Sequence, residues 1–197
     1  MRNTMQIAQR QVGPGYPVYV IAEIGSNHDS DLEKAKELIK AARGAGADAV
    51  KLQSFTAEGL LNPLRPDSDG KWVAHPAYPV IERLSVPEDW HEILFDFCAS
   101  IGVTFLSAPF DSGRAELLNE IGVPAFKLAS GELTNEPLLR QVASFGKPVI
   151  LSTGAAYLEE VRRAVEVILE EKNFKVALLH CASLYPPQYS DMNILAM

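Results

Sequence analysis

Residues 20–29 read VIAEIGSNHD and set a carboxylate, Glu23, inside a run of apolar residues that begins at Val18. The run is short and rich in β-branched side chains, so it predicts a buried β-strand. An unpaired charge in a protein interior is strongly unfavourable unless a partner compensates it. We therefore expect Glu23 either to be held by a partner or to be retained for chemistry.

Apolar runs of similar length recur along the chain, and segments with helical periodicity lie between them. The expected strands cover residues 18–24, 47–52, 103–106, 125–129, 148–151 and 175–179. The main expected helices cover residues 32–46, 87–102, 113–122, 135–146 and 158–173. Four of these helices end in a glycine that suits a C-cap before a tight turn: Gly46, Gly102, Gly122 and Gly146. The sequence therefore predicts a repeating strand–helix unit.

Strands without polar alternation are covered on both faces, which indicates a parallel sheet with helical crossovers. A doubly wound open sheet and a (β/α)8 barrel both satisfy this description. The first strand–helix turn has no GxGxxG, so dinucleotide binding has little support. Polar residues follow almost every strand, and they converge on one place only if the strands form a ring. We expect an α/β fold of the TIM-barrel type.

A complete barrel needs eight strands and about 250 residues, whereas this chain of 197 residues supplies six expected strands. We expect residues 1–197 to be the N-terminal part of a (β/α)8 barrel, truncated after about six strands. The long insertion at residues 56–86 follows the second strand. It is interpreted either as a lid over the site or as an ordinary packed surface loop.

The composition limits the classes of partner. The formal net charge is −7 and no run of Lys or Arg occurs, so nucleic acid is not expected as a partner. No apolar stretch approaches the roughly 18 residues that a membrane span needs, so no membrane partner and a cytoplasmic location are expected. Cys98 and Cys181 lie far apart without CxxC spacing. They are interpreted as buried thiols in a reducing compartment.

Two lysines at strand ends, Lys51 in AVKLQ and Lys127 in AFKLAS, carry the strongest chemical signal after Glu23. Their stems can lie along the strands while the ammonium groups meet an anion. The neighbouring hydroxyls of Ser130, Ser152 and Thr153 favour a doubly anionic substrate that carries a phosphate and a carboxylate. The alternative is structural, with each lysine paired to a carboxylate such as Glu23 or Glu132.

The histidines show no closed metal-ligand set. His28 could serve as a base, as a metal ligand or as a brace for the loop after the first strand, and bracing is favoured; His91 is interpreted as a helix-surface residue. His180 and Cys181 are adjacent on an expected strand, so they should point to opposite faces and cannot easily hold one ion. No metal site is expected within these 197 residues.

Six stretches stand in order from about Tyr19 to the last residues: IAEIGSNHD, AGADAVKLQSF, FLSAPFD, FKLASGE, FGKPVILSTG and LLHCASLYP. Together they resemble the sialic acid synthase family, the phosphoenolpyruvate-dependent nonulosonic acid synthases. The resemblance implies a (β/α)8 barrel followed by a small antifreeze-like domain. It also implies condensation of phosphoenolpyruvate with an N-acetylated amino sugar, such as N-acetylmannosamine, with release of phosphate. A divalent metal, manganese or magnesium, with two histidine ligands beyond residue 197, and a homodimer are further implications.

The resemblance also assigns roles by motif. Glu23 matches the catalytic carboxylate. The residues that match the phosphoenolpyruvate side are Lys51, Lys127, Ser130 and Ser152, and those that match the sugar side are Gln53 and Tyr185. Two positions depart from the family pattern, because Ala108 stands where many relatives have Thr and Ser183 where relatives often have Asn. The acceptor sugar stays open, with N-acetylmannosamine and the precursors of legionaminic and pseudaminic acids as alternatives.

Two other functions remain as alternatives. A Schiff-base (class I) aldolase would use Lys51 or Lys127 as an amine nucleophile on a barrel strand. The third alternative is that the short chain is a natural product that acts as a binding or regulatory module without catalysis. Because the metal ligands that the resemblance implies lie outside this chain, residues 1–197 by themselves are expected to be inactive.

Overall fold

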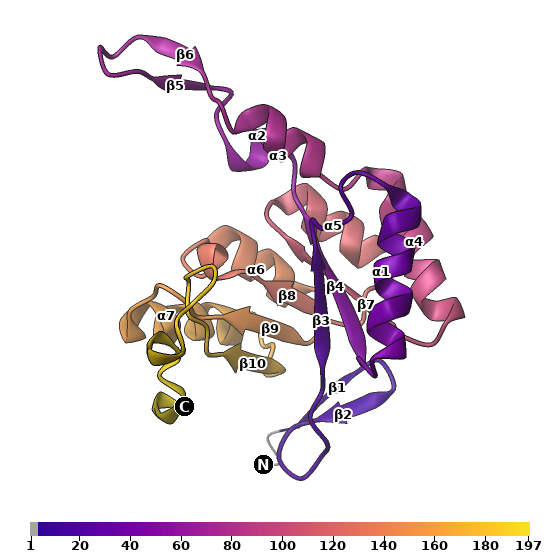
Figure 1. Cartoon of the computed structure of the whole chain (residues 1–197). Helices are drawn as coiled ribbons and strands as arrows, with labels where there is room; N and C mark the ends of the chain where they lie inside the picture. The colour runs from indigo at the N-terminus through magenta and orange to yellow at the C-terminus, as the bar shows by residue number, and fades with distance from the viewer. Residues whose placement is uncertain (1–3) are drawn as a thin grey trace. The chain divides into compact units, whose positions relative to one another are not determined.

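The computed structural model describes residues 4–197, which divide into two compact units: residues 19–123, and residues 4–18 together with 124–197. Each unit contains a three-stranded parallel sheet with helices between successive strands (Figure 1). All six expected strands and all five main expected helices are present, with ends that differ by a few residues. The α/β class with parallel sheets is therefore confirmed.

In the unit of residues 19–123 the strand order is β3–β4–β7, and both strand pairs are parallel. Its main elements are β3 (Ile21–Gly25), α1 (Leu32–Gly44), β4 (Ala49–Ser54), α4 (Glu88–Ser100), β7 (Thr104–Pro109) and α5 (Ser112–Glu120). Aspartates cap two of the helices, since Asp31 accepts the backbone amides of Glu33 and Lys34 and Asp111 accepts that of Arg114. The caps fix where α1 and α5 begin after their strands.

The insertion after β4 has secondary structure of its own. It consists of α2 (Ala57–Leu60), β5 (Leu64–Pro66), β6 (Trp72–Ala74) and α3 (Tyr78–Leu84). Strands β5 and β6 form an antiparallel hairpin that projects beyond α2 and α3 (Figure 1), and every residue of both strands is exposed. A hydrogen bond of 2.9 Å from the Tyr78 hydroxyl to Glu58 Oε1 joins α3 to α2 at its base.

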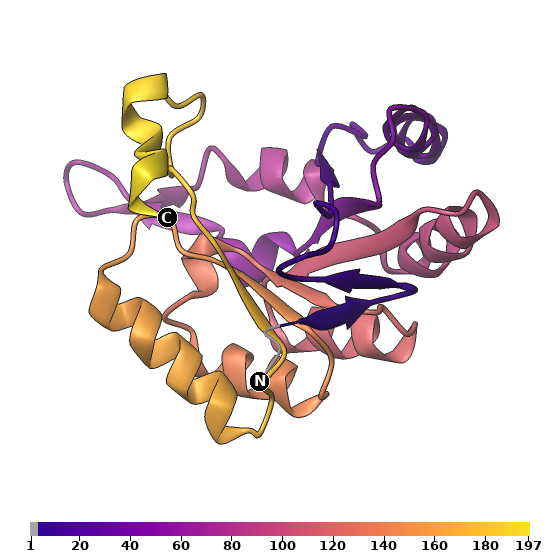
Figure 2. The same cartoon turned by 90° about the horizontal axis from the view of Figure 1, so that it is seen from below.

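In the other unit the strand order is β10–β9–β8, again parallel throughout. Its elements are β8 (Phe126–Leu128), η1 (Ser130–Glu132), α6 (Glu136–Ser144), β9 (Val149–Ser152), α7 (Leu158–Glu170), β10 (Val176–Leu179), η2 (Tyr189–Met192) and η3 (Ile194–Ala196). Helix α7, orange in Figure 2, lies alongside the strands of this sheet. The antiparallel hairpin of β1 (Met5–Ile7) and β2 (Arg10–Val12) was not expected from the sequence.

His91 lies on the buried face of α4, and only 1% of its surface is exposed. Its assignment to the helix surface was therefore wrong. Its Nδ1 lies 3.0 Å from the carbonyl of Pro87 and 3.1 Å from that of Glu88, and carbonyls can only accept. Nδ1 therefore carries the proton, and Nε2 accepts from the Ser54 hydroxyl at 2.7 Å. Ser107 Oγ lies 2.6 Å from Ser54 Oγ and completes a buried polar network between β4, β7 and α4.

This network makes the stability of the unit sensitive to acid. Burial lowers the pKa of His91 below its ordinary value of about 6.5, so the unfolded chain binds a proton more readily than the folded one. The contribution is fully present above about pH 6.5 and is lost as the pH falls through the folded pKa. We expect the urea unfolding free energy to fall between neutral and mildly acidic pH, and to fall less in His91→Gln. Equal pH slopes for the two proteins would contradict this assignment.

The two cysteines differ in environment. Cys98 on α4 is fully buried, and burial raises the pKa of its thiol to about 12. Cys181 is only half-buried, so the expectation of two buried thiols holds for Cys98 alone. We expect a disulfide reagent at mildly alkaline pH to modify Cys181 in the native chain and Cys98 only after denaturation. Cys181→Ser should abolish the native reaction, and rapid native labelling of that variant would show that Cys98 is accessible.

No helix among residues 4–197 combines the length and the apolar character that crossing a membrane requires.

Candidate functional site

Three of the predicted site residues meet at the carboxyl ends of β3 and β4. Glu23 and Lys51 are partners in the strand register, and the Lys51 ammonium forms an ion pair with Glu23 Oε2. Gln53 Nε2 donates to the other carboxylate oxygen, Oε1, at 3.2 Å. Lys51 and Gln53 are two residues apart on β4 and so project from the same face. The carboxylate is thus held by a cation and an amide from one neighbouring strand.

The expectation that Glu23 is buried was wrong. Its side chain is 45% exposed, because β3 is an edge strand of its three-stranded sheet, and Val18 and Val20 are exposed as well. The structural alternative for Lys51 is the arrangement observed, since this lysine, 12% exposed, pairs with Glu23. A half-exposed pair of this kind contributes little to stability. Its chemical value lies in fixing the positions of the two charged groups.

Gly25 makes room for this carboxylate. The register between β3 and β4 shifts between Glu23 and Gly25, and Gly25 takes a φ of +55° that residues with side chains rarely adopt. A Cβ at this position would lie 3.1 Å from Glu23 Oε1. Because residue 25 has no side chain, the backbone at the end of β3 can pass close to the Glu23 carboxylate.

A second cluster lies at the carboxyl ends of β8 and β9. Lys127 is only 7% exposed, and its Nζ donates to Ser152 Oγ at 2.6 Å and to the carbonyl of Leu128 at 2.8 Å. An ammonium group held by hydrogen bonds at a strand end presents its positive charge at a fixed position. This arrangement suits the binding of an anion. Glu132, the carboxylate considered from the sequence as a partner of Lys127, accepts a hydrogen bond from Asn135 at 2.8 Å.

Two more predicted hydroxyls surround the backbone of Gly154, just after β9. The Gly154 amide donates to Ser130 Oγ at 3.0 Å, and Ser183 Oγ lies against the same glycine. Tyr185, predicted on the sugar side, is 97% exposed. Ala108 is buried on β7 and is the register partner of Gln53, so the hydroxyl of a Thr there would lie beside β4.

The histidines do not form a metal site within the described part of the chain. No group of three or more His, Cys, Asp or Glu side chains among residues 4–197 is placed to hold an ion. The implied metal therefore does not fit this set of donors. His180 and Cys181 both line one cavity of about 720 Å³. Their expected place on a strand was wrong, because β10 ends at Leu179. His180 Nε2 instead bonds the carbonyl of Met192 at 2.8 Å.

His28 braces the turn after β3, as expected. Its ring is fully buried and packs edge-on against Trp90 at 5.7 Å between centroids, and its Nδ1 accepts the backbone amide of Ser30 at 3.1 Å. Burial lowers its pKa. The ring therefore acts as a neutral acceptor that supports a turn in which Asp29 and Ser30 both have positive φ.

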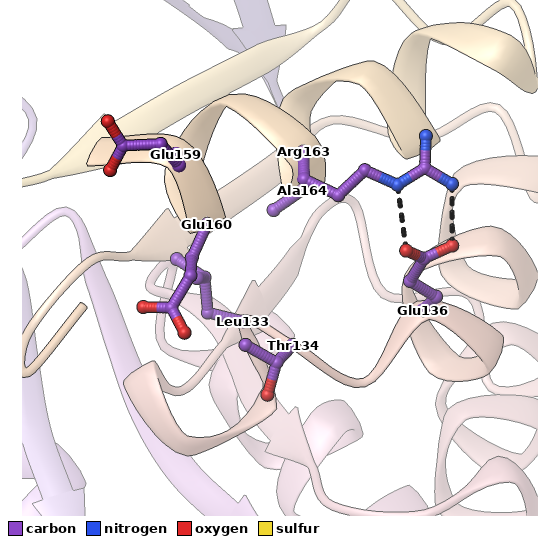
Figure 3. A pocket seen from close by; sticks show the side chains of 7 residues that line it. All are labelled: Leu133, Thr134, Glu136, Glu159, Glu160, Arg163 and Ala164. Carbon is purple, nitrogen blue, oxygen red and sulfur yellow. Dashed lines mark hydrogen bonds and ion pairs between the residues drawn. The ribbon is translucent and has the colours of Figure 1, made fainter. Parts of the chain in front are cut away.

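The unit that contains residues 124–197 has a second cavity, a groove of about 270 Å³ between α6, α7 and the residues just before α6 (Figure 3). Arg163 donates hydrogen bonds to both carboxylate oxygens of Glu136, at 2.7 and 2.8 Å, and these bonds lower the pKa of Glu136. Arg140 joins Glu170 and Glu171 nearby. At this groove Arg163 and Glu136 therefore belong to an ion-pair network on α6 and α7.

The fold is of the α/β class with parallel sheets, and lysines and hydroxyls gather at the carboxyl ends of its strands. Comparison with known families is decisive, because residues 38–197 match the model of the NeuB family. The chain belongs to the NeuB family.

Individual relatives agree with this membership. The spore coat polysaccharide biosynthesis protein SpsE of Bacillus subtilis is 40% identical over 98% of this chain and 52% of its own length. The N,N'-diacetyllegionaminic acid synthase of Legionella pneumophila is 38% identical over 94% of this chain and 54% of its own length. The chain thus spans about half the length of the curated relatives it matches.

A solved structure shows the same fold. The N-acetylneuraminic acid synthetase of Leptospira borgpetersenii, crystallised with citrate, superposes with a TM-score of 0.88 at 30% identity, over 98% of this chain and 64% of that chain. This neighbour is a TIM-barrel enzyme. The resemblance drawn from the sequence motifs is confirmed at the level of the family.

Proposed function

We propose that this protein condenses phosphoenolpyruvate with an N-acetylated amino sugar to form a nonulosonic acid, with release of phosphate. The observation that carries the proposal is the nearly buried Lys127 ammonium held against Ser152 at the ends of β8 and β9. Relatives with 30–40% identity include a legionaminic acid synthase and a sialic acid synthetase, which supports the same class of reaction. The six strands are proposed to belong to a (β/α)8 barrel.

The proposed roles follow from charge and position. Lys127, Ser152, Ser130 and Lys51 bind the anionic groups of phosphoenolpyruvate, and Gln53 and Tyr185 contact the sugar. During the reaction the methylene carbon of phosphoenolpyruvate attacks the sugar aldehyde, and positive charge develops at the enol carbon. A fixed carboxylate such as Glu23 stabilises that charge most strongly in the transition state. Water then adds to this carbon and phosphate leaves.

The ion pair gives Glu23 and Lys51 distinct but linked tasks. Lys51 neutralises the carboxylate in the structure and is also assigned to phosphoenolpyruvate. When the anion binds, it competes with Glu23 for the ammonium. Gln53 keeps a hydrogen bond to Oε1 in either case, so the carboxylate stays oriented while its cation is shared.

The aldolase alternative finds no support in the geometry. A Schiff base needs an amine that is free to attack a carbonyl. Lys51 is engaged by Glu23, and Lys127 donates to Ser152 and to the carbonyl of Leu128. Both ammonium groups are already held by neighbouring groups of the protein, and this arrangement suits the binding of an anion better than nucleophilic attack on a carbonyl.

Phosphate release tests the proposed function directly. The whole protein that the gene encodes is incubated with phosphoenolpyruvate, manganese and either N-acetylmannosamine or a diacetylated hexose precursor, and inorganic phosphate is measured with time. We expect release that depends on the sugar, and saturable binding of phosphoenolpyruvate by the 197-residue chain itself. Absence of both, together with a borohydride-trapped adduct on a lysine, would replace this reaction by the aldolase.

A further inference from the structure

Gly154 stands where side chains from two other loops meet, one after β8 and one after β10. An ideal Cβ built on it would overlap Ser183 Oγ, and it would lie 3.0 Å from Ser130 Oγ and 3.2 Å from Cys181 Cβ. The φ of Gly154 does not lie in the left-handed region. The backbone here could therefore accept alanine, and it is the space around the residue that excludes a side chain.

The same glycine orders the hydroxyl protons around it. Its amide donates to Ser130 Oγ at 3.0 Å, which occupies an acceptor position of that oxygen and leaves its own O–H available to donate. The Lys127 ammonium likewise donates to Ser152 Oγ at 2.6 Å and leaves the Ser152 O–H available to donate. Two hydroxyls are thus prepared as donors, which is the state that an anion requires.

We propose that Gly154 is a positioning residue whose missing side chain lets the Ser130 and Ser183 hydroxyls stand together beside its amide, and so sets the affinity of this cluster for the anionic groups of phosphoenolpyruvate. The affinity part of this inference rests on the proposed function. A methyl group at residue 154 must displace Ser183, whose side chain is exposed and can swing away, and must press on Ser130, which is half-buried. The chain is expected to fold with its donors misplaced.

The test is a double-mutant cycle of Gly154→Ala and Ser183→Ala, with dissociation constants for phosphoenolpyruvate and for inorganic phosphate measured by calorimetry on the 197-residue chain. Gly131→Ala is the matched control. Gly131 is adjacent to Ser130, its Cβ would meet nothing within 4 Å, and its φ is not left-handed. Thermal unfolding of every variant is followed in parallel.

We expect Gly154→Ala to weaken phosphoenolpyruvate binding about tenfold or more, since it removes donors to a charged ligand, whereas Gly131→Ala changes it less than about twofold. In the Ser183→Ala background the added cost of Gly154→Ala should fall below about threefold, because the main collision is gone. Unchanged affinity in Gly154→Ala, or an equal loss in both backgrounds, would overturn the proposal.

Failure of the proposed function gives a different pattern. If the unmodified chain binds neither ligand, the proposal that this cluster binds phosphoenolpyruvate is wrong, and only the melting temperatures test whether Gly154 positions the two serines. The positioning role is supported if Gly154→Ala lowers the melting temperature and the loss is smaller in the Ser183→Ala background. Additive losses reject it.

Discussion

Replacing Glu23 by Gln is expected to lower the rate of phosphate release by a factor on the order of 10² to 10³, a magnitude typical of removing one preorganised electrostatic contact to a transition state. Gln keeps the size of the side chain and its hydrogen bond with Gln53, but it removes the charge that faces the enol carbon. Phosphoenolpyruvate affinity should stay the same or rise, because Lys51 loses its competing carboxylate. Steady-state kinetics and equilibrium binding separate the two effects.

Two comparisons control this result. Lys51→Ala should weaken phosphoenolpyruvate binding, which distinguishes the ammonium from the carboxylate. Glu33→Gln removes a carboxylate from another ion pair, with Lys36 at 2.7 Å on α1, and should leave both rate and affinity unchanged. An equal loss of affinity in Glu23→Gln and Lys51→Ala would refute the separate roles of the pair.

Lys127→Met is expected to weaken phosphoenolpyruvate binding by about ten- to a hundredfold, as expected for the loss of a charge-assisted hydrogen bond. Stability should respond in the opposite sense. Methionine fills a similar volume without a charge to desolvate, so the unfolding free energy should stay within about 1 kcal/mol of the original value or increase. Calorimetric titration and urea unfolding of the same variant measure the two quantities.

Lys175→Met provides the control for Lys127→Met. Lys175 is exposed and its ammonium donates to the carbonyl of Gly146 at 3.0 Å, away from the Ser152 hydroxyl. Its replacement should leave affinity unchanged. A large loss of stability in Lys127→Met would show that this lysine mainly supports the fold.

The strand–helix repeat was predictable because parallel strands leave continuous apolar runs and helix ends leave glycines. Gly46, Gly102, Gly122 and Gly146 all have positive φ, as their predicted C-cap role requires. The β5–β6 hairpin was not predictable, because two exposed three-residue strands have no hydrophobic pattern. His91 was misplaced since one polar residue on a helix reads as a surface residue unless its partners on other strands are known.

The candidate site was predictable in its residues and not in its contacts. Strand-end position singled out Glu23, Lys51, Gln53 and Lys127, and the structure joins the first three. The exposure of Glu23 depends on which strand forms an edge, which one strand's sequence does not specify. The need for a glycine at residue 154 was not predictable, because it depends on the space around that residue and not on its own chemistry.

The β5–β6 hairpin has a consequence for how proteins of this type can diversify. It is joined to the rest of its unit through α2 and α3, and a hydrogen bond of 2.8 Å from the His75 amide to the Pro63 carbonyl closes its base. Its strands contribute no buried side chain, so residues can be inserted, deleted or exchanged at its tip without altering the hydrophobic core. Natural variation in length and composition should therefore accumulate there, and the tip offers a place to graft a foreign peptide while the strands that carry the lysines keep their geometry.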